Sequence, residues 1–269
     1  MATAARGSPT SASCSPGLAW SAISRRWRGV PGGAALDGPG RVSPLRVAVP
    51  ALGIDVSALL LRPADARWLL VLAHGAGAGM RHPFMETLSA ALAGVRIATL
   101  RYQFPYMERG QRRPDPPATL VAAVSAAVSE ARRLAPDLPL LAGGKSLGGR
   151  MTSQAAATGS QGGGFERAAG LVFFGFPLHA AGRPSVSRAA HLKDVAQPLL
   201  FLQGTRDALA DLSLIRSVCA ALGERATLRV VDGADHGFAV LKRSGRTADQ
   251  VFSELAQNVM LWADRLASR

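Results

Sequence analysis

The stretch Gly144-Lys145-Ser146-Leu147-Gly148 decides the fold of this chain. A short apolar run, residues 138–142, leads into it, and small, helix-compatible residues, 149–157, follow it. This G-x-S-x-G pattern is typical of a tight turn between a β-strand and an α-helix, with the serine at the turn. The serine takes unfavourable backbone angles there, and the two flanking glycines let the chain pass without a Cβ clash. The pattern predicts a serine hydroxyl raised above the end of a sheet, beside a helix N-terminus.

Apolar strands alternate with helical segments on both sides of this turn. Strands are expected near residues 45–49, 56–61, 68–73, 95–100, 138–143, 170–175, 198–203 and 226–231. Helices are expected near residues 83–94, 119–133, 147–158, 211–222 and 248–267, with a long polar loop over 101–117 and another loop over 159–164. Strands that are apolar throughout, alternating with helices, indicate an α/β fold with a mostly parallel central sheet and helices on both faces. We therefore expect one domain over residues 45–269.

The first 40 residues differ from the rest of the chain. They are rich in Ala, Ser, Gly, Pro and Arg, contain no acidic residue before Asp37, and show no helical or strand period. We interpret residues 1–40 as a disordered N-terminal extension. An Arg- and Ser-rich, acid-poor start also fits a mitochondrial transit peptide, and that alternative stays open.

Cysteine content and charge bear on compartment and partners. The two cysteines, Cys14 and Cys219, predict no structural disulfide, so a reducing, cytoplasmic location is the default. No apolar run reaches the about 18 residues that span a bilayer, so no membrane partner is expected. The net charge of +13 comes almost entirely from arginine. Nucleic-acid binders more often interleave basic runs with aromatic residues, and the densest clusters here, 25–28 and 112–113, are short, so we expect no nucleic-acid partner.

Two further residues complete a catalytic pattern with Ser146. A serine hydroxyl becomes a nucleophile when a base removes its proton, and the base is usually a histidine held by a carboxylate. Asp207 follows the strand at 198–203, and His236 follows the strand at 226–231. The carboxyl ends of parallel strands meet at one edge of a sheet, so we expect all three side chains at that edge. The order Ser, Asp, His along the chain is that of the α/β-hydrolase fold, with Ser146 as nucleophile, His236 as base and Asp207 as the orienting acid.

An oxyanion hole needs backbone N–H groups near the nucleophile. Leu147 directly follows Ser146 and is expected to supply one. The glycine-rich loop at 74–79 follows the strand at 68–73, and Ala76 is its expected donor. His74, at the start of this loop, is expected to shape it by hydrogen bonding rather than to act as a base.

Each of these residues has a rival or an alternative role. Ser146 has the alternative of an ordinary helix-capping serine. Asp211 is a rival to Asp207, but it stands where a helix begins, which favours a role at the helix N-terminus. Asp235 is interpreted as a solvated neighbour of His236.

Phosphate, metal and cofactor chemistry is not expected. Residues 144–146 match the end of the phosphate-loop pattern G-x-x-x-x-G-K-[ST], but its first glycine falls on Pro139. His82, His179 and His191 share no metal-ligand spacing.

Few features of the sequence bear on the identity of the substrate. Only residues 176–197 separate two strands where many hydrolases insert a lid, so no large lid is expected. Arg81, Arg101 and Arg150 are candidates for binding an acidic acyl group, with salt bridges between loops as the alternative.

Six segments together resemble a known family. They are residues 74–80, 101–106, 144–151, 173–179, 204–207 and 233–236. They are similar to the α/β-hydrolase family named for testis-expressed proteins and a subunit of a chromatin acetyltransferase complex, which is related to the dienelactone hydrolases. The resemblance covers about residues 45–267 and implies the α/β-hydrolase fold. Dienelactone hydrolases use a cysteine nucleophile, so Ser146 at that position implies ester, thioester or peptide substrates.

Two functional hypotheses follow. The first is a serine hydrolase that acts on a small molecule through an acyl-enzyme. The second is a non-catalytic interaction module with the same fold, as the resemblance to the chromatin-complex subunit implies.

Overall fold

The computed structural model describes residues 40–158 and 164–268, which belong to one compact unit. The predicted extension at 1–40, apart from Gly40, and most of the predicted loop at 159–164 lie outside the described residues. The strands are β1 (Val42–Val49), β2 (Ile54–Leu61), β3 (Trp68–Ala73), β4 (Ile97–Tyr102), β5 (Leu140–Lys145), β6 (Ala168–Phe174), β7 (Leu199–Arg206) and β8 (Ala226–Asp235). The α-helices are α2 (Pro83–Gly94), α3 (Pro105–Glu108), α4 (Pro117–Leu134), α5 (Leu147–Ala157), α6 (Leu212–Leu222) and α7 (Ala248–Ala267). Short 3-10 helices are η1 (Pro50–Leu52), η2 (Phe165–Arg167), η3 (Ser187–Asp194), η4 (Gly223–Arg225) and η5 (Lys242–Ser244).

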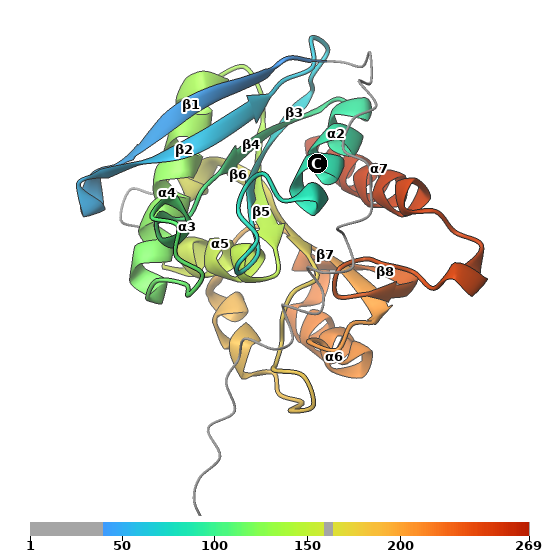
Figure 1. Cartoon of the computed structure of the whole chain (residues 1–269). Coiled ribbons are helices and arrows are strands. Elements are labelled where there is room, and N and C mark those ends of the chain that lie inside the picture. The colour runs from blue at the N-terminus through green and yellow to red at the C-terminus, as the bar shows by residue number, and fades with distance from the viewer. Residues whose placement is uncertain (1–39, 159–163, 269) are drawn as a thin grey trace, which may run out of the picture. The chain divides into compact units, whose positions relative to one another are not determined.

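The described strands form one sheet in the order β1-β2-β4-β3-β5-β6-β7-β8 (Figure 1). From β4 to β8 in this order neighbouring strands are parallel, whereas β1 pairs antiparallel with β2 and β2 with β4. Ala73 pairs with Tyr102 on one side and with Gly144 on the other, so β4, β3 and β5 end near the same level. The predicted mostly parallel sheet is confirmed, and the carboxyl ends of β3 to β8 share one edge.

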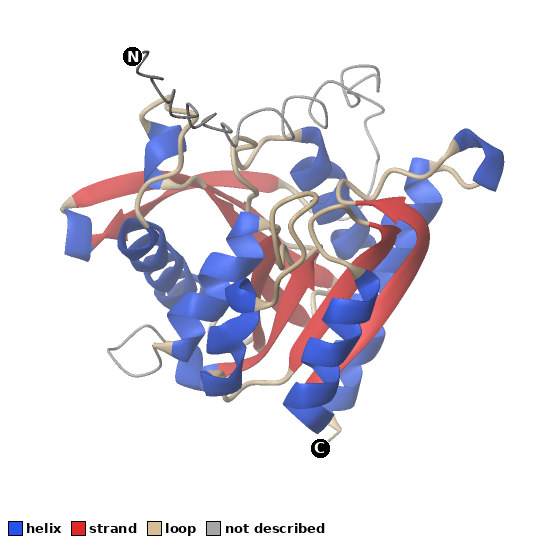
Figure 2. Cartoon of the chain, turned by 90° about the horizontal axis from the view of Figure 1, so that it is seen from below, coloured by secondary structure: helices blue, strands red, loops and turns tan. Residues whose placement is uncertain are grey.

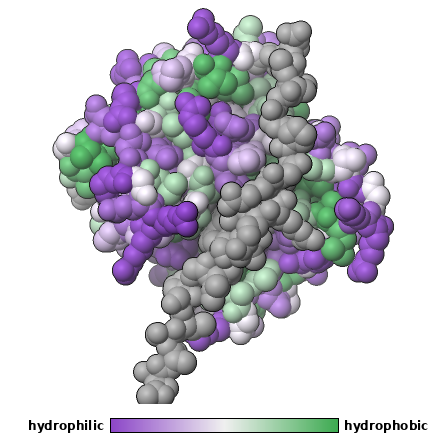
Figure 3. Space-filling model, in the orientation of Figure 1, coloured by the Kyte–Doolittle hydropathy of each residue, from purple (hydrophilic) through white to green (hydrophobic). Residues whose placement is uncertain are grey.

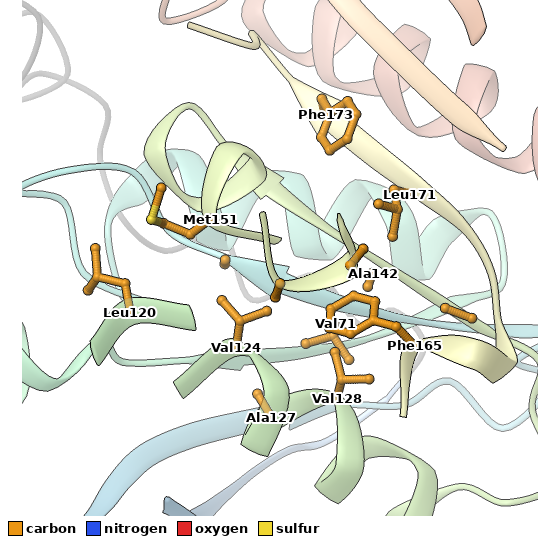
Figure 4. Close-up of a cluster of buried hydrophobic side chains, with 14 of the residues drawn as sticks. Val71, Leu120, Val124, Ala127, Val128, Ala142, Met151, Phe165, Leu171 and Phe173 are labelled. Atoms are coloured by element: carbon orange, nitrogen blue, oxygen red, sulfur yellow. The ribbon is translucent and has the colours of Figure 1, made fainter. Parts of the chain in front are cut away.

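Helices cover both faces of the sheet (Figure 2). Helices α4, α5 and α6 contribute to a single cluster of buried apolar side chains with the strands. Figure 4 shows part of this cluster, where Leu120, Val124 and Val128 of α4 lie against the sheet. Helices α2 and α7 pack together on the opposite face. Every strand from β3 to β7 is therefore covered on both sides, which explains why these strands are mostly apolar.

Strand β5 begins at Leu140, directly after Pro139. Proline has no N–H to donate to a sheet, but the carbonyl of Pro139 accepts a hydrogen bond from Leu69 N at 3.0 Å. The proline therefore precedes the strand without weakening it.

The predicted polar loop over 101–117 was wrong in its first half. Strand β4 extends to Tyr102, and helix α3 follows at Pro105. Tyr102, Phe104 and Tyr106 are fully buried, and the Phe104 ring packs edge-on against Tyr102 with centroids 5.4 Å apart. Only Gln103 and Pro105 separate these aromatic residues, but the arginines and prolines on either side made the segment look like a polar loop in the sequence.

Strand β4 also begins two residues later than predicted. Arg96 has φ of 63°, in the left-handed region, where the chain turns out of α2. Residues 95 and 96 therefore belong to the turn rather than to the strand.

The connection from β6 to β7, residues 175–198, contains one short 3-10 helix, η3, which packs on α5. No large lid is inserted there, as predicted. Among the described residues, no helix combines the length and apolar character needed to cross a membrane. On the face in Figure 3, hydrophilic side chains are interspersed with apolar ones over the described surface.

Candidate active site

Ser146 stands at a strained turn between β5 and α5. Its φ of 52° and ψ of −115° are rare for a residue with a Cβ, and strain of this kind typically costs about 1–3 kcal/mol. A Cβ on Gly144 would lie 2.5 Å from Ala73 O, and a Cβ on Gly148 would lie 2.6 Å from His74 O. Both positions therefore require glycine, because the end of β3 passes directly against the turn.

Ser146, His236 and Asp207 form a continuous hydrogen-bonded chain. His236 Nε2 lies 2.8 Å from Ser146 Oγ, and His236 Nδ1 lies 2.7 Å from Asp207 Oδ2. Ser146 occupies the N-cap position of α5, but its side chain makes no capping bond. All three residues are buried. The three residues that the sequence places at the ends of β5, β7 and β8 are thus brought together.

Asp207 is fixed by neighbours other than His236. Gln203 Nε2 also donates to Asp207 Oδ2, while Leu209 N donates to Oδ1 at 2.8 Å. Gln203 Oε1 in turn accepts from Phe176 N at 3.0 Å. The carboxylate is therefore held on both oxygens, and one of them faces the imidazole.

The charges around the pair favour a neutral imidazole and an ionised carboxylate. Burial lowers the pKa of His236, and the nearby Lys145 charge lowers it further, against the opposing effects of Asp207 and Asp235. Burial works to raise the pKa of Asp207, but His236, Lys145 and the Leu209 N–H together outweigh it and leave that pKa below its ordinary value. A neutral histidine with Nδ1–H directed at a carboxylate presents an accepting lone pair at Nε2 to the serine hydroxyl, which is the form a general base needs.

The oxyanion-hole candidates lie at the same edge. The Leu147 N–H belongs to the first turn of α5, where the helix offers no acceptor. In the turn after β3, Gly77 N donates to Tyr106 Oη at 3.2 Å, whereas Ala76 N has no hydrogen-bond acceptor among the described residues. The close approach of His74 O to Gly148 brings this turn against the start of α5.

His74 shapes this turn, as predicted. Its Nδ1 lies 2.8 Å from Gly75 O and its Nε2 accepts from Phe104 N at 3.0 Å, which fixes the neutral Nδ1–H tautomer. Burial lowers the pKa of His74 to about 4, so the ring stays uncharged at neutral pH.

The two rival acids have other partners. Asp211 caps α6, accepting from Ser213 N at 2.8 Å, as predicted for a residue at a helix start. Asp235 was predicted to be solvated, but its Oδ1 accepts from Gly237 N at 2.8 Å and Ala239 N at 3.0 Å. It therefore organises the loop that carries His236.

Sequence reasoning missed Lys145 and Gln203 as parts of this site. Lys145 Nζ lies 2.5 Å from His236 O, and the residue is only 3% exposed. The available signal was a lysine at the end of an otherwise apolar strand, since such a charge needs a buried partner. Gln203 offered a similar signal at the end of the apolar run of β7.

The three candidate arginines have different surroundings. Arg81 is exposed, whereas Arg101 is buried and donates from Nη1 to Met80 O at 3.1 Å. The Nε atoms of Arg101 and Arg150 are buried without a hydrogen-bond partner. Among the described residues none of the three forms a salt bridge, so the predicted alternative of loop-tying ion pairs is not supported.

Ser153 and His191 form a second hydrogen-bonded Ser–His pair. Ser153 Oγ lies 2.8 Å from His191 Nε2, but it also donates to Arg150 O at 2.9 Å on its own helix. A hydroxyl that donates to a helix carbonyl has no proton left for His191, so the imidazole donates to it and joins η3 to α5. The described residues contain no cluster of three or more potential metal ligands.

The strand order, the strained serine turn and the Ser–His–Asp chain define a protein of the α/β-hydrolase fold. Residues 66–264 match the family model described as alpha/beta hydrolase domain, and the chain belongs to this family.

Solved structures agree with this fold. An α/β serine hydrolase homologue from Coxiella burnetii is 18% identical, with a TM-score of 0.63, 80% of this chain and 96% of that chain covered. A dienelactone hydrolase from Anabaena variabilis is 20% identical, with a TM-score of 0.63 and coverage of 83% and 97%. An α/β serine hydrolase without a lid from Xanthomonas campestris is 21% identical, with a TM-score of 0.63 and coverage of 83% and 96%. At these identities the matches concern the fold alone.

Proposed function

We propose that this protein is a serine hydrolase that cleaves a small ester-type substrate through an acyl-enzyme. The observation that carries the proposal is the buried chain of hydrogen bonds from Ser146 through His236 to Asp207. The hydrogen bonds along this chain and the charges around it support the roles of nucleophile, base and orienting acid.

In the first half-reaction Ser146 Oγ attacks the acyl carbon while its proton passes to His236 Nε2. Asp207 holds the Nδ1–H tautomer and stabilises the imidazolium that forms. The N–H groups of Ala76 and Leu147 hold the negative oxygen of the tetrahedral intermediate. His236 then returns the proton to the leaving group, and the acyl group stays on Ser146.

In the second half-reaction water replaces the leaving group. His236 removes a proton from the water as it attacks the acyl-enzyme, and then protonates Ser146 Oγ as the acid product leaves. Every proton moves through one imidazole, so the proposed chemistry uses no metal and no cofactor.

We further propose a substrate with an acidic acyl part, on the basis of the three candidate arginines. Arg81, Arg101 and Arg150 add positive charge, and no acid neutralises them by a salt bridge within the described residues. The guanidinium fork of an arginine matches a carboxylate. One similar structure is a dienelactone hydrolase, and Est1E from Butyrivibrio proteoclasticus, 15% identical, is known with ferulic acid bound. Short esters and thioesters of carboxylic acids are therefore the first compounds to screen.

A fluorophosphonate probe tests the proposal because it phosphonylates an activated serine. The wild type is expected to be labelled and Ser146→Ala to be unlabelled. Ser153→Ala is the matched control, since it removes another buried serine that is hydrogen-bonded to a histidine. Absence of labelling in the wild type, or equal labelling of Ser146→Ala, would refute the proposal.

The competing hypothesis is a non-catalytic interaction module. It follows from the resemblance of the sequence to the family of testis-expressed and chromatin-complex proteins. A scaffold has no need of a complete Ser146–His236–Asp207 chain. The interaction-module hypothesis predicts that Ser146→Ala keeps all functions of the wild type in the cell. Loss of a cellular function in this folded variant would favour the enzyme.

A further inference from the structure

Lys145 is a buried charged residue that has no role in the steps of the proposed mechanism. Its side chain is buried to 3% exposure, directly before the nucleophile and at the end of β5. Burying an ammonium group costs several kcal/mol unless partners compensate. A structural role alone would be served as well by an apolar residue of similar length, so its charge calls for another explanation.

The ammonium group is enclosed by parts of the active site. Nζ donates to the main-chain oxygen of His236 at 2.5 Å. It lies 5.6 Å from the ring centroid of Phe84 and 5.5 Å from that of Phe238, and the two rings stack against each other. Aromatic faces attract a cation at these distances.

The backbone at Gly175 also lies against the Lys145 ammonium group and leaves space for it. Gly175, after β6, has φ of 70°, and a Cβ there would lie 3.0 Å from Lys145 Nζ. The same Cβ would lie 3.4 Å from both Asp207 Oδ2 and His236 Nδ1. Lys145 therefore occupies the same enclosed space as the acid and the base.

We propose that Lys145 is a positioning residue, which clamps the backbone of His236 beside Ser146 and holds a positive charge next to the catalytic pair. This inference rests on the proposed function of Ser146, His236 and Asp207. One ammonium group on β5 thereby couples the strand that carries the nucleophile to the loop that carries the base.

The charged and titratable neighbours of Lys145 come from several elements. Asp207 follows β7, Asp235 ends β8, and His82 precedes α2. Burial lowers the pKa of Lys145 to about 8, with Asp207 and Asp235 opposing the change. The group is thus mostly protonated at neutral pH, and its charge lowers the pKa of both His236 and His82.

The test measures the rate of fluorophosphonate labelling of the full chain as a function of pH. Lys145→Met keeps the length of the side chain and removes both donor and charge. Lys145→Gln is the second variant, because it removes the charge but keeps a donor. Lys193→Met, on the exposed side of η3, is the matched control with the same change in net charge. Circular dichroism and thermal unfolding establish which variants fold, and either Lys145 variant suffices.

Both Lys145 variants are expected to label more slowly, and Lys145→Met by about tenfold or more, since small misplacements of a catalytic group cost up to about 100-fold. In both variants the acid limb, which is the low-pH fall in the labelling rate, is expected to move to higher pH than in the wild type. The reason is that His236 binds a proton more readily once the Lys145 charge is removed. A change that merely loosened the structure would slow labelling without moving this limb.

Labelling of a folded Lys145 variant at the wild-type rate, or with the acid limb of the wild type, would overturn the inference and leave the proposed function standing. A wild type that is not labelled at all would instead refute the proposed function, and the role of Lys145 with it.

Discussion

Gln203 donates a hydrogen bond to Asp207 Oδ2, the same oxygen that lies 2.7 Å from His236 Nδ1. The other end of the Gln203 amide accepts from Phe176 N at 3.0 Å. One buried amide thus joins the chain after β6 to the acid after β7. A carboxylate that accepts two donors on one oxygen has little freedom to turn away from the imidazole.

Gln203→Met tests this link, since it keeps the length of the side chain and removes both hydrogen bonds. Phe176 N is then left buried without a partner, which typically costs about 1–3 kcal/mol of unfolding free energy. Asp207 also loses a donor that favours its charged form, so fluorophosphonate labelling is expected to slow as well. Chemical denaturation and labelling rates measure the two effects, with the exposed Gln257→Met as control. Stability and labelling equal to the control in both assays would contradict the assigned role.

Gly148→Ala tests the contact between the serine turn and β3. The added Cβ would lie 2.5 Å from Ala73 O and 2.6 Å from His74 O, and these are backbone atoms that cannot move alone. Overpacking of this kind typically costs about 1–3 kcal/mol or more, and it would push the turn that carries Ala76 away from Ser146.

Gly94→Ala is the matched control for that change. A Cβ at Gly94 meets nothing within 4 Å, and its φ is not positive. Alanine there is expected to leave unfolding free energy unchanged or to raise it by up to about 1 kcal/mol. Equal denaturation midpoints for the two variants would show that the turn tolerates a side chain at Gly148.

His74 predicts how stability depends on pH. Its pKa is about 4 in the folded protein, below the ordinary value of 6.5, because burial disfavours the charged ring. The unfolded chain therefore binds more protons between pH 6.5 and 4. The stabilisation from neutral His74 is complete above pH 6.5 and is lost as the pH falls towards 4. The unfolding free energy falls by about 3 kcal/mol in all, as follows from the pKa difference between 6.5 and about 4.

His74→Gln isolates this effect, because glutamine offers a donor and an acceptor but does not titrate in this range. The wild type is expected to be the more stable at pH 7, and the gap should narrow as the pH falls towards 4. Denaturant unfolding at a series of pH values gives the two curves. A gap that stays constant over this range would contradict the assignment of a buried, neutral His74.

The sequence predicted those features that leave a local mark. The order of strands and helices follows from apolar runs and periodicity, and Ser146, Asp207 and His236 each follow a strand whose end lies at one known edge. The burial of the aromatic residues at 102, 104 and 106 was missed because the prolines and arginines around them are typical of an exposed loop. Lys145 and Gln203 were missed because each has a backbone partner far away in the chain, His236 O for Lys145 and Phe176 N for Gln203. No local pattern records a side chain that meets a distant backbone atom.

The distance along the chain between Ser146 and His236 has a consequence for refolding experiments. These residues are 90 positions apart and directly follow β5 and β8, and β6 and β7 lie between those strands in the sheet. Parallel pairings of this kind close long loops and are slow to form. Recovery of probe labelling after dilution from denaturant is therefore expected to lag behind the return of the helical circular dichroism signal. Labelling of Ser146 would then report when the sheet is complete.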